Sequence, residues 1–324
     1  ISMTEQFPEH HFSWKVLGAV LKQTGRVSES LIASQKSINL NPQDAEGHNN
    51  IGVSLQEMGR LEDAEVSYRR AIALKPEFVD PHYNLSVTLQ ELGRIGDAEA
   101  SYIKAIALKP DYAEAHNNLG VILQALGRFE DAEASYIKAI ALKPDYAEAH
   151  SNLGNTLKER GRFEDAEASY IKAITLKPNY ADVHNNLGNA LKEISRFEDA
   201  EVSYRLAIKL RPDYSEAHSN LGITLKEMNR LEEAEESLRQ AITLKSDLAE
   251  AHSNLGIMLK EMNRLEEAEV SLRQAITLKS NLAEAHTNLG KLLLKIGKHH
   301  EGLNEEKIGA GFISFNLNKG FSLI

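Results

Sequence analysis

The chain has 324 residues, of which 42% are hydrophobic and 26% are charged, as in an ordinary folded protein. It contains no cysteine, which excludes disulfides, thiol catalysis and zinc sites built on cysteine. A net charge of −10 weighs against a nucleic-acid backbone as the partner. No apolar run reaches the ~18 residues that span a membrane. We therefore expect neither nucleic acid nor a membrane as partner, and we expect a cytoplasmic location.

The dominant feature of the chain is a repeat with a period of 34 residues. The string His-x-Asn-Leu-Gly begins at His116 and returns at every period up to His286, with weaker copies at His48 and His82. A fixed period of this length indicates a stack of similar helical repeats, each burying its apolar faces against its neighbours. Function should therefore lie along the surface of the stack.

The first ten residues lie outside a complete repeat. Residues 1–7, which are followed by Pro8, occupy the register of the second helix of an earlier repeat. We therefore expect residues 1–10 to be the remnant of a preceding repeat, and the chain to be a fragment of a longer array.

The repeat from residue 113 to residue 146 illustrates the predicted helix pair. Apolar residues three and four apart form one face of a first helix, which Gly127 is expected to end in a left-handed conformation. Asn229 and Asn263 take the place of this glycine in later repeats. A second helix follows, with acidic residues in its N-terminal turn, and Pro144 closes the repeat. Each repeat is therefore predicted to be two antiparallel helices.

Small residues explain how the two helices can meet. Gly120 and Ala132 lie where the helices are expected to cross, so their axes can approach near the lower end of the usual range of about 8–10 Å. Tyr136 and Ala139 are expected to contact the next repeat. A single repeat cannot bury both faces, so about three or more must stack.

These positions resemble the tetratricopeptide repeat pattern, with histidine in place of its usual first aromatic residue. The matching residues are His116, Leu119, Gly120, Leu123, Ala132, Tyr136, Ala139 and Pro144. The resemblance covers roughly residues 11–300 and implies an all-α, right-handed solenoid of eight full repeats and a degenerate ninth. The array is also similar to those of O-GlcNAc transferases and of bacterial proteins in which such repeats are fused to a transferase.

The first helices carry a column of asparagines on the side that packing leaves free. The predicted site residues of this column and its neighbours are Asn50, Asn84, Asn118, Asn152, Asn186, Asn220, Asn254 and Asn288, with Asn117 and Asn185. An amide can pair with both the N–H and the C=O of an extended peptide, whatever its side chains. The column is similar to the asparagine ladder that contacts protein substrates in O-GlcNAc transferases. We predict that it lines a concave peptide-binding groove; the alternative is that the amides bridge neighbouring turns inside the stack.

A second column changes character along the chain. One turn after the asparagine it reads Gln56, Gln90 and Gln124, and then Lys158, Lys192, Lys226 and Lys260. The lysines predict a preference for acidic partner segments; the alternative is that they pair with the glutamates that follow them. The carboxylate clamp of some tetratricopeptide repeats needs basic residues early on the first helix. Here that position is acidic, as at Glu114, so we do not expect that clamp.

The histidine column does not predict a metal site. Equivalent positions on adjacent repeats are separated by roughly 10 Å, whereas two imidazoles that share an ion must each lie about 2 Å from it. We therefore expect the histidines to pack in the seam between repeats. Similar residues repeated along a line do not converge on one point, so we predict no catalytic site, no metal and no cofactor.

Residues 301–324 break the pattern. Residues 312–317 alternate between apolar and polar, a turn signal occupies residues 318–320, and residues 321–324 are again largely apolar. This order predicts a short β-hairpin. The hairpin would cover the last helix, begin a further domain, or dock on a neighbouring molecule as an added strand.

From these observations we predict a non-catalytic scaffold that holds extended protein or peptide segments along a concave groove. Two alternatives remain open. The array could be the substrate-recruiting arm of a larger glycosyltransferase or sulfotransferase, or it could be a structural array that self-associates end to end.

Overall fold

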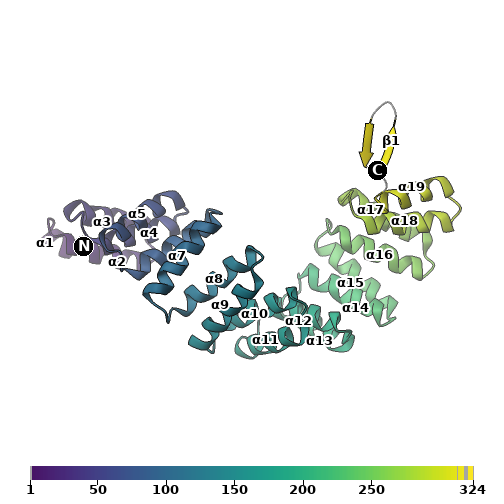
Figure 1. Ribbon diagram of the computed structural model, residues 1–324, viewed down its shortest axis with the longest axis horizontal. Helices are drawn as coiled ribbons and strands as arrows, with labels where there is room; N and C mark the ends of the chain where they lie inside the picture. Colours follow the sequence, from purple (N-terminus) through teal and green to yellow (C-terminus); the bar gives the residue numbers. More distant parts are fainter. Residues whose placement is uncertain (1, 312, 317–319, 324) are drawn as a thin grey trace. The chain divides into compact units, whose positions relative to one another are not determined.

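The structure is a computed structural model that describes residues 2–311, 313–316 and 320–323, with side chains described for residues 4–311. It is a succession of helix pairs (Figure 1), which confirms the all-α solenoid. After α1 (Ser2–Gln6), the first helices of the pairs are α2 (His11–Gln23), α4 (Ala45–Glu57), α6 (Val79–Glu91), α8 (Ala113–Ala125), α10 (Ala147–Glu159), α12 (Ala181–Glu193), α14 (Ser215–Glu227), α16 (Ala249–Glu261) and α18 (Ala283–Lys295). The second helices are α3 (Val27–Leu40), α5 (Leu61–Leu74), α7 (Ile95–Leu108), α9 (Phe129–Leu142), α11 (Phe163–Leu176), α13 (Phe197–Leu210), α15 (Leu231–Leu244), α17 (Leu265–Leu278) and α19 (His299–Gly309).

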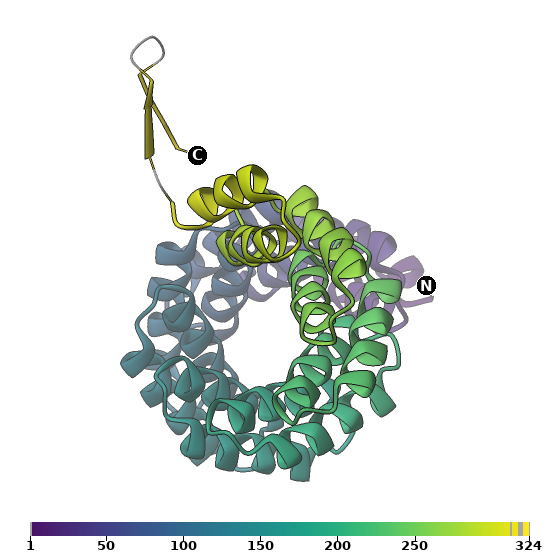
Figure 2. The ribbon, with the colours of Figure 1, turned by 90° about the vertical axis from the view of Figure 1, so that its right-hand side faces the viewer.

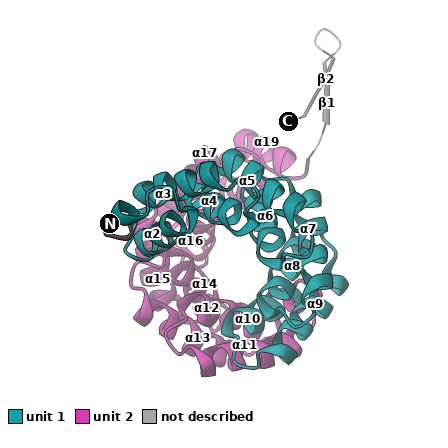
Figure 3. Ribbon diagram, turned by 90° about the vertical axis from the view of Figure 1, so that its left-hand side faces the viewer, with its two compact units in different colours: residues 1–156 teal, residues 157–324 magenta. Residues whose placement is uncertain are grey.

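The chain divides into two compact units, an N-terminal unit of residues 1–156 and a C-terminal unit of residues 157–324. In the N-terminal unit α4, α6 and α8 lie on the inner side of a curve, and α5, α7 and α9 lie outside them (Figure 3). In the C-terminal unit α12, α14 and α16 lie inside α13 and α15 (Figure 3), as the green helices of Figure 2 also show. We call the side of the first helices that faces away from the second helices the inner face.

The two helices of a pair meet at a glycine. A Cβ built on Gly120 would lie 2.6 Å from the ring of Tyr136, and one built on Gly188 would lie 2.6 Å from that of Tyr204. Both tyrosines are fully buried. The glycine therefore provides the space that the ring fills, and the structure packs Tyr136 against the first helix of its own repeat, not only toward the next repeat as the sequence suggested.

The turns inside the pairs require a left-handed residue. Gly127 has a φ of +73°, and Asn229 and Asn263 take the same conformation with φ of 58° and 60°. These three residues behave as predicted. Ser195, with a φ of 60°, also adopts it, although a serine offers no sequence signal for a left-handed turn.

The end of the chain contains a short last helix. Helix α19 has 11 residues and continues to Gly309, so the predicted boundary at residue 300 falls inside this helix. Beyond it, β1 (Ile313–Asn316) pairs antiparallel with β2 (Gly320–Leu323), as the predicted hairpin requires; residues 312, 317–319 and 324 lie outside the described residues. The division into residues 1–10, 11–300 and 301–324 otherwise stays a prediction.

None of the helices in the described part of the chain combines the length and the apolar character needed to cross a bilayer.

Candidate functional site

The histidine column fastens the turns between repeats. In each of the eight repeats that carry this histidine, the ring Nε2–H donates to the carbonyl oxygen six residues earlier, at 2.9 to 3.3 Å. The acceptor is a proline carbonyl except at His252 and His286, where it belongs to a serine. Burial lowers the pKa of His184, although the hydrogen bond to the carbonyl of Pro178 acts in the opposite direction. Among the described residues, no three histidine, aspartate or glutamate side chains are grouped to hold a metal ion.

The asparagine column of the N-terminal unit bridges successive first helices. Each of three amides donates from Nδ2 to a side chain 35 residues earlier, on the preceding first helix, at 3.1 Å. The three pairs are Asn84 to Asn49, Asn118 to Tyr83, and Asn152 to Asn117. The bridging role that the sequence left as an alternative is therefore present.

The bridge leaves some hydrogen-bonding groups of the asparagine amide without a partner at two positions. Each Nδ2 carries two hydrogens, and Oδ1 has two lone pairs. At Asn84 and Asn152 the bridge takes one hydrogen, and no other partner lies within hydrogen-bonding distance among the described residues. Both side chains are half-buried. What remains on each is one donor and one acceptor, the pair of groups that an extended peptide backbone presents.

The column is less regular in the C-terminal unit. Asn220 donates to Asn185 Oδ1 at 3.0 Å, which repeats the bridge. Asn186 also has a partner within the chain, whereas Asn50 in the N-terminal unit and Asn254 have none among the described residues. Asn288 departs from the pattern, because its Nδ2 donates to the carbonyl of Glu284 on its own helix at 3.0 Å.

The glutamines of the second column form hydrogen bonds with buried core residues. Their Oε1 atoms accept hydrogen bonds from the hydroxyls of buried tyrosines at 3.0 to 3.2 Å; the pairs are Gln56 with Tyr68, Gln90 with Tyr102, and Gln124 with Tyr136. Burial raises the pKa of all three tyrosines, so their hydroxyls stay protonated donors. These glutamines therefore complete the packing of a helix pair.

The change from glutamine to lysine on the first helix coincides with a change in the hydrogen bond of the tyrosine on the paired second helix. Where Lys192 replaces the glutamine, the hydroxyl of Tyr204 donates instead to Asn189 Oδ1 at 2.8 Å. In the next two repeats leucine replaces the tyrosine, at Leu238 and Leu272, and no hydroxyl needs an acceptor. The residues equivalent to Asn189 are there the apolar Ile223 and Ile257. Sequence reasoning missed this coupling, although the signal is visible when the two columns are read together.

Three of the four lysines lie beside the glutamate that follows them. Lys158, Lys192 and Lys226 each have a carboxylate oxygen at 3.5 Å from Nζ, as the alternative reading of the column expected. Lys260 differs, because its Nζ donates to Asn288 Oδ1 at 3.2 Å. Burial lowers the pKa of Lys260, and neighbouring lysines, Lys291 foremost, lower it further.

One inner-face residue escaped the sequence reasoning. Tyr83 stands where neighbouring repeats have asparagine, and its hydroxyl accepts the bridge from Asn118. Its ring centroid lies 4.8 Å from that of Tyr112 and 6.0 Å from that of Tyr102. The N-terminal unit therefore has an aromatic residue on the first helix α6, at a position where the repeats on either side have Asn49 and Asn117.

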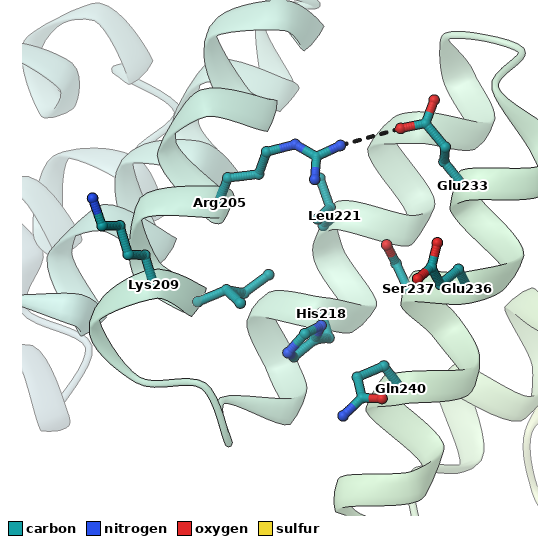
Figure 4. Close-up of a pocket in the computed structure, with 9 residues that line it drawn as sticks. Arg205, Lys209, His218, Leu221, Glu233, Glu236, Ser237 and Gln240 are labelled. Carbon is teal, nitrogen blue, oxygen red and sulfur yellow. Dashed lines mark hydrogen bonds and ion pairs between the residues drawn. The ribbon is translucent and has the colours of Figure 1, made fainter.

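The C-terminal unit also has cavities between its second helices. The larger, of about 430 Å³, lies among α13, α14 and α15, and an ion pair of 3.3 Å between Arg205 and Glu233 spans it (Figure 4). His218 lines its floor. A cavity of about 340 Å³ with Arg239 and His252 in the equivalent places follows one repeat later. Because the cavity recurs with the period of the stack, it reflects the spacing of the second helices.

These features define a class of protein: a solenoid of helix pairs in which glycines and buried tyrosines meet between the two helices and polar columns recur along the first helices. Models of the tetratricopeptide repeat match residues 45–78, 113–146 and 181–214, and related models of the same repeat match 88–127, 154–195, 224–262 and 258–297, and 135–168 and 203–236. Together they span residues 45–78 and 88–297, well over half of the chain. The chain belongs to the tetratricopeptide repeat family, and as such an array it is a protein-interaction scaffold.

Solved structures share this fold at low sequence identity. The Cut9-Hcn1 hetero-tetramer of the APC/C aligns with 82% of this chain at a TM-score of 0.61 and 17% identity. The aligned part spans 52% of that relative, about half its length. PilF of Pseudomonas aeruginosa aligns with 64% of this chain and 95% of its own, at a TM-score of 0.56 and 22% identity. YrrB, described as a TPR protein with an unusual peptide-binding site, aligns with 57% of this chain and 95% of its own, at 0.49 and 24%. No curated protein sequence matches the chain significantly.

Proposed function

We propose that the protein is a non-catalytic scaffold that holds extended protein or peptide segments along the inner face of its first helices. The observation that carries the proposal is the asparagine bridge of the N-terminal unit. At Asn84 and Asn152 the bridge uses one amide hydrogen. It therefore orients the amide while leaving a donor and an acceptor for a peptide backbone.

The bridge and the proposed peptide contact support each other energetically. A side chain that must be ordered when a ligand binds loses conformational entropy, on the order of 0.5–1.5 kcal/mol for each immobilised group. An amide that is already held by the preceding helix has lost that freedom on folding. Regular, pre-ordered amides therefore suit the recognition of a main chain, and they are indifferent to the partner's sequence.

The test compares two triple variants on an array of immobilised peptides of random sequence. In the first, Asn84→Ala, Asn118→Ala and Asn152→Ala remove the column of the N-terminal unit. In the control, Asn39→Ala, Asn179→Ala and Asn281→Ala remove the same number of amides from exposed positions outside the first helices. We expect the first variant to lose about 1 kcal/mol or more for each peptide bond pair, and the control to bind as the original protein does.

Circular dichroism of the first variant should retain the helical signal, because the stack is held mainly by the apolar contacts between helices. Equal binding by the two triple variants would contradict the proposal. Three further statements stay predictions: the recruitment of substrates for a larger transferase, end-to-end self-association, and a cytoplasmic location.

A further inference from the structure

Among the described residues, the asparagine bridge is absent from the last two repeats, at Asn254 and at Asn288. By the pattern of Asn84, Asn152 and Asn220, the Nδ2 of Asn288 would donate to Ser253, the residue 35 positions earlier. It donates instead to its own helix, to the carbonyl of Glu284. Ser253 is 3% exposed, and its Oγ has no hydrogen-bond partner among the described residues. A buried hydroxyl without a hydrogen-bond partner destabilises the folded state, so a site that tolerates it needs an explanation.

A cluster of lysines lies beside this broken bridge. It consists of Lys226 on α14, Lys260 on α16, and Lys291 and Lys295 on α18; the charges of the other three lysines act on Lys260. Lys260 donates to Asn288 Oδ1 at 3.2 Å, and Lys295 donates to Asn263 Oδ1 at 3.3 Å. The ammonium groups of Lys260 and Lys295 are thus met by neutral amides.

The carboxylates that face the cluster are few. Glu261 acts on Lys260 and lies 3.5 Å from Lys226, which also has Glu227 at 3.5 Å. Neither Lys260 nor Lys291 has a carboxylate within ion-pair distance in the described part of the chain. Positive charge therefore exceeds negative charge here, in a protein whose net charge is −10.

We propose that Lys226, Lys260, Lys291 and Lys295, together with the hydroxyl of Ser253, form a carboxylate-binding subsite that accepts acidic side chains of the bound segment. The subsite rests on the proposed function, since it is part of the inner face. A carboxylate would supply the missing counter-charge and an acceptor for the Ser253 hydroxyl. The lysines lie in the second half of their helices, so the subsite differs from the carboxylate clamp that the acidic residues at the helix starts exclude.

The chemistry of the cluster favours several carboxylates over one phosphate. It contains no arginine, the side chain whose planar fork best matches a single phosphate group. Its charges are spread over three first helices that follow one another at roughly 8–10 Å. An extended chain advances about 3.3 Å per residue, so acidic residues about three apart would meet successive lysines. Small free anions cannot span this distance.

The test measures binding of labelled peptides to the full chain by fluorescence anisotropy. Three peptides of equal length carry glutamate, glutamine or lysine at every third position and are otherwise identical. We expect the glutamate peptide to bind about tenfold more tightly than the glutamine peptide at low salt, and the advantage to shrink as salt is added. The lysine peptide should bind most weakly.

Two matched pairs of substitutions test whether these lysines cause the tighter binding of the glutamate peptide. Lys260→Gln with Lys291→Gln should abolish the advantage of the glutamate peptide. Lys172→Gln with Lys245→Gln removes the same charge from exposed positions on or after second helices and should keep it. If the advantage persists in the first pair, or is lost equally in both, the subsite is overturned.

Two further outcomes separate the subsite from the function on which it rests. Equal binding of the glutamate and glutamine peptides overturns the subsite and leaves the peptide-binding function standing, whereas no binding of any peptide contradicts that function. Inorganic phosphate and glutarate serve as competitors. If either displaces the glutamate peptide at equal concentration, the cluster is a small-anion site and the assignment to an acidic segment is wrong.

Discussion

In the N-terminal unit Gln56, Gln90 and Gln124 accept hydrogen bonds from the hydroxyls of buried tyrosines. In the C-terminal unit lysines stand at the same position of the first helix and lie beside glutamates or, at Lys260, beside an amide oxygen. The difference follows from what the paired helix buries. A buried hydroxyl needs an acceptor, and Asn189 supplies it for Tyr204 where Lys192 replaces the glutamine. Where leucine replaces the tyrosine, as at Leu238, no hydroxyl needs an acceptor, so this position can also hold a charge.

The change from glutamine to lysine alters the charge of the first helices. Helices α4, α6 and α8 contain acidic residues but no lysine or arginine, whereas α12, α14 and α16 each carry a lysine near their end. Two units of the same fold therefore present different charges to a partner. The comparison teaches that the charge of the first helices is coupled to the core packing of the helix beside them.

The largest effect should come from emptying the tyrosine position. Tyr136→Ala removes a fully buried ring and should lower the free energy of unfolding by about 3–5 kcal/mol. Tyr136→Phe keeps the ring and should cost only about 0.5–1.5 kcal/mol. Urea unfolding, fitted with a nearest-neighbour description suited to repeat arrays, measures both. Equal costs of the two substitutions would show that the ring is not what supports the pair.

A smaller effect should come from the glutamine in front of that ring. Gln124→Leu leaves the buried hydroxyl of Tyr136 without this acceptor and should lower the free energy of unfolding by about 1–3 kcal/mol. The same change in a Tyr136→Phe background should cost less, because no tyrosine hydroxyl then loses its acceptor. A part of the cost should remain, because the hydroxyl of Thr156 also donates to Gln124.

The equivalent change in the C-terminal unit is the control. Lys226→Leu stands in front of Leu238, which has no hydroxyl, and should change the free energy of unfolding by less than about 0.5 kcal/mol. A double-mutant cycle at Gln124 and Tyr136 that gives no coupling energy would break the proposed link between the two columns.

The smallest effect concerns Lys260, whose Nζ donates to the amide oxygen of Asn288. Lys260→Met should raise the free energy of unfolding by about 0.5 kcal/mol or less, because it removes a partly buried charge repelled by its neighbours. Lys192→Met, which removes a lysine lying beside Glu193, should give no such gain.

The pH dependence of stability tests independently whether the charge of Lys260 destabilises the folded state. The folded-state pKa of Lys260 is lowered from the ordinary value of 10.5. Between the lowered value and 10.5 the unfolded chain therefore binds more protons than the folded one, so stability rises with pH in that window. The gap in unfolding free energy between Lys260→Met and the original protein should narrow as pH rises through it. A gap that widens would contradict the lowered pKa.

Much of the backbone could be predicted from the period. Gly127, Asn229 and Asn263 occupy the left-handed turns where the sequence placed them, because few residue types tolerate that conformation. Helix ends at glycine and proline follow from equally local rules. Ser195 in the same conformation could not be predicted, because there the repetition of the fold overrides the preference of the residue.

The inner face was predicted less completely. The asparagines lie on the first helices as expected, but the bridges from Asn84 and Asn152 to the preceding helix involve residues 35 positions apart. A hydrogen bond of that kind depends on the spacing and rotation of two helices, which a sequence read one repeat at a time does not contain. The same holds for Asn288, where the neighbouring Lys260 redirects the amide.

By itself the sequence determined the 34-residue repeat, the two helices of each repeat and the family to which the chain belongs. These follow from periodicity and local backbone preferences, which act over a few residues. Only the tertiary structure decided which polar columns form hydrogen bonds inside the stack and which keep polar groups on its surface. Glutamine and lysine, or two asparagines at successive repeats, look alike as polar residues, and their roles separate only when helices distant in sequence bring a hydroxyl, an amide or a charge against them.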